Sequence, residues 1–203
     1  YSALPQCGAF LNIIADESVR HVYLKGLLAS SASVFFAAVG RESEKRKEKS
    51  EKVKGKSEKS GEKSTLTSVF ILQDNDEAGY FYHDLTQILG TDNVLFFPSS
   101  YRRAVKYAQR DAANEILRTE TLSRLAAVSG NAKKRADNSE TAPFLYVVTC
   151  PEALSELVVS KRRLDERTIN IAVGDIVYLA DLGRKLREFG FSVVDYVYEP
   201  GQF

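Results

Sequence analysis

Three short apolar runs constrain the fold more than any other feature of the sequence. Residues 69–72, 94–97 and 144–148 are continuous apolar stretches bounded by polar or turn-forming residues. Runs of this length without alternation are typical of strands that are covered on both faces. Segments with helical spacing of apolar residues follow them, over 74–90 and from 106 to about 127. This alternation predicts an α/β fold in which helices flank a parallel sheet.

Residues 26–33 stand where a phosphate-binding loop would precede these strands. In the pattern G-x-x-x-x-G-K-[ST], the lysine reaches the phosphates of a bound nucleotide. The defining positions are filled by Gly26, Ser31, Ala32 and Ser33. We expect a strand at 21–24 before the loop and a helix from residue 33 after it, as in a RecA/P-loop-like domain. Because Ala32 replaces the lysine and carries no charge, we expect no bound nucleotide cofactor. A chance strand–turn–helix with small residues in the turn is the alternative.

Residues 42–64 form a charged segment made almost entirely of Glu, Lys, Arg, Ser and Gly. Such a composition offers little apolar surface to bury, so it predicts a disordered surface insertion. A tether for nucleic acid is the alternative, although the interspersed glutamates oppose it.

The pattern changes after about residue 160. Residues 168–173 and 192–198 alternate like strands with one solvated face, and a helix with one apolar face lies between them, over 179–189. The sequence therefore predicts two domains. Residues 1–160 form the domain with the degenerate phosphate loop, and residues 161–203 form the truncated start of a smaller α+β domain.

Composition excludes several kinds of site. The two cysteines, Cys7 and Cys150, are far apart, and neither His21 nor His83 has a neighbouring Cys or His, so no metal site is expected. The net charge of +1 gives no global attraction to nucleic acid or to a membrane surface. No apolar run approaches the roughly 20 residues of a membrane span. The chain starts at a tyrosine and contains no methionine, which indicates a fragment of a longer protein.

Several segments together resemble one family. They are residues 21–27 with the small residues after them, residues 93–98, and the closing run 173–203, which ends in Glu-Pro-Gly-Gln-Phe. In order and residue type, they resemble the amino-terminal, UvrB-like module of the bacterial transcription-repair coupling factors (the Mfd family). Two departures from UvrB itself favour that family. Ala32 replaces the lysine, and residues 98–104 run into the next helix without a long aromatic hairpin.

The resemblance implies a non-catalytic adaptor. In that family the ATP-driven DNA translocase, with its ATP and magnesium, lies elsewhere in the parent chain. The amino-terminal module recruits the damage-recognition protein UvrA and makes autoinhibitory contacts with the rest of the parent. RNA polymerase and DNA would be contacted by other domains, and the location would be the bacterial cytoplasm.

Two sets of residues are candidate binding sites. Arg184 and Arg187 lie three residues apart opposite the apolar face of the last predicted helix, and the resemblance places this helix, with Phe203, beside the UvrA-contacting surface. Ordinary solvent exposure is the alternative for both arginines.

A possible nucleic-acid face consists of Tyr101, Arg103, Lys106, Tyr107 and Arg110. Aromatic and basic side chains on one helical face can bind a single strand, although a solvated face is the commoner outcome. Two further functions therefore stay open: a nucleotide-binding, DNA-processing enzyme and a DNA-binding module. No catalytic residue is identified in this sequence.

Overall fold

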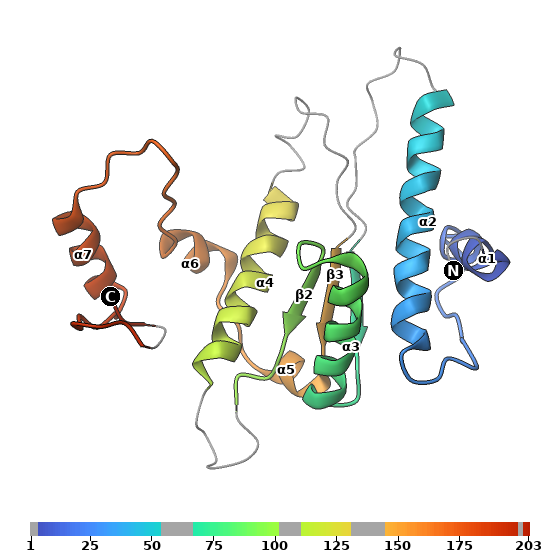
Figure 1. Ribbon diagram of the computed structural model, residues 1–203, viewed down its shortest axis with the longest axis horizontal. Helices are drawn as coiled ribbons and strands as arrows, with labels where there is room; N and C mark the ends of the chain where they lie inside the picture. The colour runs from blue at the N-terminus through green and yellow to red at the C-terminus, as the bar shows by residue number, and fades with distance from the viewer. Residues whose placement is uncertain (1–3, 54–66, 102–110, 131–144, 199–200) are drawn as a thin grey trace.

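The computed structural model describes residues 4–53, 67–101, 111–130, 145–198 and 201–203. Its centre is a three-stranded sheet of β1 (Thr67–Ile71), β2 (Val94–Phe97) and β3 (Leu145–Thr149), in the order β1–β3–β2 (Figure 1). Both strand pairs are parallel. The predicted α/β class, the three strands and their parallel pairing are therefore confirmed. The expected cover on both faces is wrong for β1, whose Val69 and Ile71 are more than half exposed.

The middle strand, β3, forms the centre of the fold. All of its residues are buried, because it has a strand on each side and side chains packed on each face. Val147 lies in register with Val69 of β1 and with Leu95 of β2. The continuous apolar sequence of β3 follows from this position, since no face of the strand meets water.

Helix α3 (Asn75–Leu89) connects β1 to β2 and begins and ends as predicted. The carboxylate of Asp74 accepts hydrogen bonds from the backbone N–H groups of Asp76 and Glu77, at 3.0 and 2.9 Å. It thereby caps two of the N–H groups that a helix start leaves without partners. Gly90 ends the helix with a φ of +83°, a conformation that favours glycine.

Aromatic rings join the sheet to the helices on one of its faces. Phe70 of β1 stacks on Tyr146 of β3, with ring centroids 5.6 Å apart. Its ring also contacts Phe36 and Phe81, at 4.9 and 5.1 Å. These contacts pack helices α2 (Ser31–Val53) and α3 against the sheet.

Helix α4 (Ala112–Gly130) packs against β2. Its Leu122 and Leu125 side chains contact the main core, as the predicted helix requires. The helix starts later and ends later than the sequence indicates. The first residues of the predicted helix, 106–110, and most of the predicted polar linker at 129–141 lie outside the described residues.

The prediction of a loop from residue 42 is wrong for its first half, because α2 continues to Val53. Glutamate, lysine and arginine are good helix formers, and pairs such as Glu42–Arg46, 3.7 Å apart, lie on adjacent turns. A segment without apolar side chains cannot form a buried helix. It can still extend a helix whose other end is packed against the protein. Two contacts anchor α2: its packing on the sheet through Phe36, and a small core shared with Cys7 and Leu11 of α1 (Pro5–Ile14). Residues 54–64 lie outside the described residues.

The strand expected at residues 21–24 is not formed. These residues follow an irregular, exposed path between α1 and α2, and the described strands are β1, β2 and β3. The run is only four residues long, and a strand exists only where another strand pairs with it. The strand–turn–helix setting of a phosphate loop is therefore absent, although α2 does begin within the loop pattern, at Ser31.

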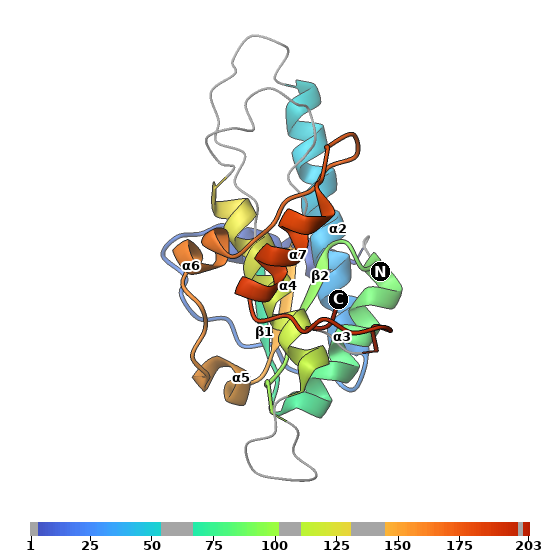
Figure 2. The ribbon, with the colours of Figure 1, turned by 90° about the vertical axis from the view of Figure 1, so that its left-hand side faces the viewer.

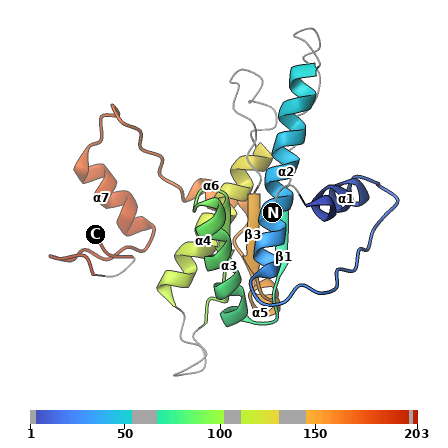
Figure 3. The same cartoon turned by 45° about the vertical axis from the view of Figure 1, so that its right-hand side comes forward.

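The C-terminal region, which we define as residues 161–203, contains helices but little sheet. A short helix, α5 (Pro151–Ser155), precedes it, and α6 (Lys161–Glu166) and α7 (Leu179–Glu188) belong to it. Helix α7 matches its prediction, whereas α6 was not predicted. Residues 168–173 are irregular, and the strand expected at 192–198 is reduced to one parallel bridge between Ser192 and Gln202. Figures 1 and 3 place α7 at one end of the molecule and α1 at the other, with the sheet between them.

Candidate functional site

The phosphate-loop residues do not form a loop between a strand and a helix. Gly26 is exposed with a φ of +86°, Ser31 is exposed, and Ala32 is half-buried. The Ser33 side chain is fully buried, and its hydroxyl donates to the Ser30 carbonyl at 2.8 Å and to the Asp84 carboxylate at 3.1 Å. This hydroxyl, which would bind magnesium in an intact loop, instead ties the start of α2 to α3.

The predicted nucleic-acid face is described only at its first residue. Tyr101 is partly exposed, and its backbone N–H donates to the Ser99 hydroxyl at 3.3 Å. The remaining members, Arg103, Lys106, Tyr107 and Arg110, lie outside the described residues.

The residues predicted to bind a partner come together around α7. The Arg187 guanidinium lies 6.0 Å from the centre of the Phe203 ring. A methyl group added at Gly183, one turn earlier, would meet the same ring at 3.5 Å, so the ring lies across the helix between these two positions. Arg184 forms an exposed ion pair with Asp181, at 2.8 Å.

Backbone hydrogen bonds hold Phe203 in this place. Its N–H donates to the Ser192 carbonyl at 2.9 Å, and its carbonyl accepts from the Val194 N–H at 3.0 Å. The chain therefore folds back on itself after α7 and returns the phenyl ring to the helix. Figure 2 shows this returning segment below α7.

Apolar side chains of the C-terminal region are exposed to an unusual degree. None of the described residues after Ala153 is buried. Val173, Ile176 and Leu179 are each more than four-fifths exposed. Exposed apolar surface of this extent is typical of surfaces through which proteins contact another chain or another domain.

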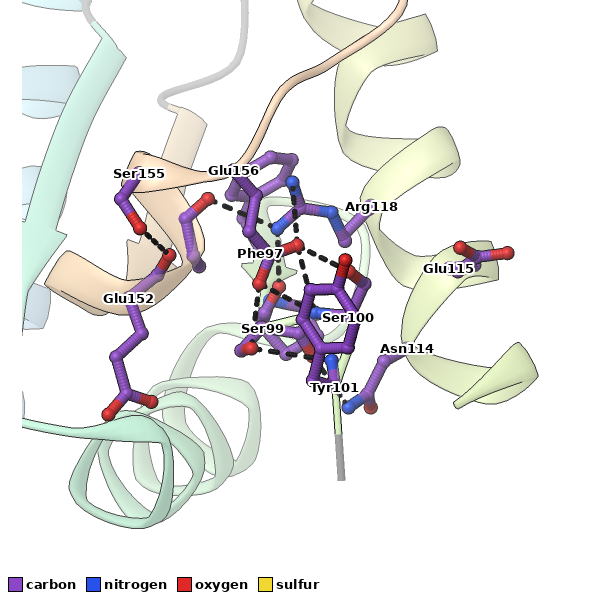
Figure 4. Close-up of polar contacts among 12 residues, drawn as sticks. Phe97, Ser99, Ser100, Tyr101, Asn114, Glu115, Arg118, Glu152, Ser155 and Glu156 are labelled. Atoms are coloured by element: carbon purple, nitrogen blue, oxygen red, sulfur yellow. Dashed lines mark hydrogen bonds and ion pairs between the residues drawn. The ribbon is translucent and has the colours of Figure 1, made fainter. Parts of the chain in front are cut away.

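A group of polar side chains lies at the carboxyl ends of β2 and β3, where open α/β sheets bind their ligands (Figure 4). The Glu156 carboxylate accepts a hydrogen bond from the Ser99 hydroxyl at 2.7 Å and from the Ser100 N–H at 3.0 Å. The Ser100 hydroxyl donates to the same carboxylate. Arg118 of α4 completes the group, with its guanidinium 3.4 Å from the carboxylate. We call Ser99, Ser100, Arg118 and Glu156 the polar cluster.

The electrostatics of the polar cluster favour a charged carboxylate. Burial alone would raise the pKa of the Glu156 carboxyl. The hydrogen bonds from Ser100 and Ser99 and the charge of Arg118 outweigh that effect and hold the pKa below its usual range. Arg118 is itself buried, lies over the Phe97 ring at 4.1 Å, and donates to the carbonyls of Pro98 and Ala153.

One residue of the polar cluster, Arg118, could be recognised from the sequence. Arg118 falls at the same helical spacing as Leu122 and Leu125, on the face that packs inward. A charged residue on an apolar helix face is expected to have a buried partner. Nothing local identifies that partner, because Glu156 is 38 residues further along the chain.

No protein-family model matches the chain, and neither a curated protein nor a solved structure matches it. Across the described residues, no helix combines the length and the apolar character needed to cross a membrane. The same residues contain no cluster of three or more His, Cys, Asp or Glu side chains arranged to hold a metal ion.

Proposed function

We propose that this chain is a non-catalytic adaptor module of a bacterial transcription-repair coupling factor and that its C-terminal region docks UvrA. The observation that carries the proposal is the exposure of that region. Its described apolar side chains find no core within the chain, so a partner is the natural source of their burial.

The composition of the surface around α7 supports the same proposal. Arg184 and Arg187 stand beside exposed apolar residues, including Tyr178 and Leu179. Interfaces typically combine an apolar centre with arginines that pair with carboxylates of the partner. An acidic and apolar surface of UvrA would complement this arrangement.

The phosphate-loop region supports a role without nucleotide chemistry. Ala32 offers no cation, and the Ser33 hydroxyl is engaged by Ser30 and Asp84. Hydrolysis requires a phosphate cradle, a magnesium ligand and an oriented water molecule. In the proposed parent protein, ATP, magnesium, DNA and RNA polymerase are used by other domains, in the bacterial cytoplasm.

Titration of the chain with UvrA tests the proposal. Charge reversal by Arg184→Glu with Arg187→Glu is expected to weaken binding by about tenfold or more, since charged contacts at interfaces are often worth more than 1 kcal/mol each. Arg20→Glu with Lys25→Glu is the matched control, because it changes the charge equally at two exposed residues outside the C-terminal region. Equal affinities for the two double variants would remove α7 from the interface.

Titration with ATP and magnesium separates this proposal from the nucleotide-dependent enzyme. The adaptor is expected to release or absorb no heat beyond dilution. Micromolar binding would contradict it, since such an affinity needs phosphate contacts that the described loop does not offer.

A further inference from the structure

The polar cluster has the composition of an anion-binding site. Two hydroxyl groups and one backbone N–H, from Ser99 and Ser100, point at a pair of oxygen atoms, and the Arg118 guanidinium faces the same pair (Figure 4). Hydroxyls, backbone amides and arginine are the groups with which proteins bind phosphate. The two oxygens that they bind here belong to the chain's own Glu156.

The donors are held in place by contacts that do not involve Glu156. The Ser99 N–H donates to the Asn75 side chain at 3.1 Å, and the Ser99 carbonyl accepts from Asn114 at 2.8 Å. The Ser100 carbonyl accepts from the Asp111 N–H at 2.8 Å. The two serines are therefore positioned by α3 and by the start of α4.

Arg118 is held independently as well. It donates to the carbonyls of Pro98 and Ala153, at 2.7 and 3.2 Å, and lies over the Phe97 ring. The backbone of the two serines and the guanidinium of Arg118 therefore have partners other than the carboxylate. This preorganisation is what an anion site requires.

We propose that Ser99, Ser100 and Arg118 form a phosphate-binding cradle that Glu156 fills in this structure and that opens when Glu156 swings out. A planar carboxylate leaves the guanidinium at 3.4 Å, longer than a close charge-assisted hydrogen bond. A tetrahedral phosphate has further oxygens beyond the two that the serines bind, and one of them would reach the guanidinium more closely.

The position of Glu156 in the chain allows it to leave. It follows α5, which has only five residues, and its backbone N–H donates to the Ala153 carbonyl over a long 3.4 Å. The next residue, Leu157, is fully exposed. Rotation of the backbone at residue 156 would therefore break no strand or long helix.

Removal of the carboxylate tests the cradle. In Glu156→Ala, the buried guanidinium loses its counter-ion, so an anion that fits should restore both charge balance and stability. We expect inorganic phosphate to bind this variant at least about tenfold more tightly than the wild-type chain, in which the carboxylate competes. The readout is the midpoint of thermal unfolding as a function of phosphate, with chloride at equal ionic strength as the reference.

A second variant separates specific binding from the general stabilising effect of phosphate on proteins. Glu156→Ala with Ser100→Ala lacks one hydroxyl of the cradle and should show only the phosphate response of the wild-type chain. Should Glu156→Ala fail to fold in chloride, its recovery in phosphate supports the cradle, and failure in both salts overturns it.

Two further ligands test which kind of phosphate compound binds the site. Phosphoserine and adenosine monophosphate, each at the concentration used for inorganic phosphate, test whether a phosphorylated side chain or a nucleotide fits the opened site. If Glu156→Ala responds to phosphate no more than the wild-type chain does, the polar cluster is a structural latch and the proposal fails.

Discussion

The helices that pack on the sheet and those of the C-terminal region have similar amphipathic sequences but very different surroundings. Helix α3 buries Ala78 and Leu85 against the sheet, whereas α7 buries no residue. Both helices have one apolar face, and α7 has the more strongly segregated of the two. An amphipathic pattern therefore specifies a helix and the face that seeks a partner, but it does not supply the partner.

We interpret this difference as a division between a region that stabilises the fold and a region that binds a partner. The sheet and its helices form a self-contained core centred on β3, in which side chains from distant parts of the sequence meet. The C-terminal region keeps its apolar side chains at the surface, where another molecule can cover them. Most of the following predictions compare two matched positions that differ in their surroundings.

The largest effect is expected from the core. Leu85→Ala removes a fully buried side chain and should cost about 2–5 kcal/mol of unfolding free energy. Leu182→Ala changes a half-buried leucine of α7 and should cost less than about 1 kcal/mol. Urea unfolding measures both, and equal losses would mean that α7 has a core of its own.

Loss of the half-buried charge at Glu156 should have the next largest effect. Glu156→Gln keeps the shape of the side chain but weakens its hydrogen bonds and its pairing with Arg118, at a cost of about 1–3 kcal/mol. Glu166→Gln is the control, because its ion pair with Arg162 is exposed and worth only a few tenths of a kcal/mol.

The same comparison has a pH dependence. Because the pKa of Glu156 is lower in the folded chain than its ordinary value of 4.5, the carboxylate stabilises the fold above that pH. This contribution is lost as the pH falls through the lowered value. The stability gap between the wild-type chain and Glu156→Gln should therefore close in acid, and a gap that widens there would contradict the assigned hydrogen bonds.

Replacing a helical glycine by alanine should have opposite effects on stability at two positions. Gly40 of α2 faces the ring of the buried Tyr146, and an added methyl group would clash with the phenol. Gly40→Ala should destabilise the chain by about 1–3 kcal/mol. Gly79 of α3 has open space around it, so Gly79→Ala should stabilise the chain by about 0.5–1 kcal/mol. Thermal unfolding of the two variants measures the difference.

The smallest effect concerns the helix caps. Asp74 accepts two N–H groups at 3.0 Å or less, and Asp74→Ala should cost about 1 kcal/mol. Ser160 caps α6 through a single long hydrogen bond of 3.4 Å, so Ser160→Ala should cost only a few tenths of a kcal/mol. A larger loss at Ser160, measured by urea unfolding, would show that the C-terminal region is more cooperative than its exposure indicates.

The elements that could be predicted from sequence are those whose signals are local. Helix α3 is specified by Asp74 at its start and Gly90 at its end, and the three strands by continuous apolar runs. The strands expected at 21–24 and 168–173 failed because a strand depends on a partner elsewhere in the chain. The charged segment begins as a helix because glutamate, lysine and arginine have high helix propensity, a property that a lack of apolar side chains does not reveal.

The candidate sites, like the missed strands, depend on contacts between residues far apart in the sequence. The grouping of Arg187 with Phe203 depends on the return of the chain after α7, and the pairing of Arg118 with Glu156 joins two different helices and their loops. Residue types predict a binding role for Arg184 and Arg187 but not for Ser99 or Ser100, and spacing along the sequence cannot place such partners. The burial of Ser33 against Asp84 was likewise hidden, since 51 residues separate the two.

Amide hydrogen exchange of the chain, alone and with UvrA, tests the central claim most directly. Without UvrA, we expect slow exchange in β3 and α3 and fast exchange throughout α7 and the segment that returns to Phe203. Addition of UvrA should slow exchange in α7 and in that returning segment and leave β3 unchanged. Absence of any UvrA-dependent protection, or protection confined to the sheet, would contradict the assignment of the C-terminal region as the docking surface.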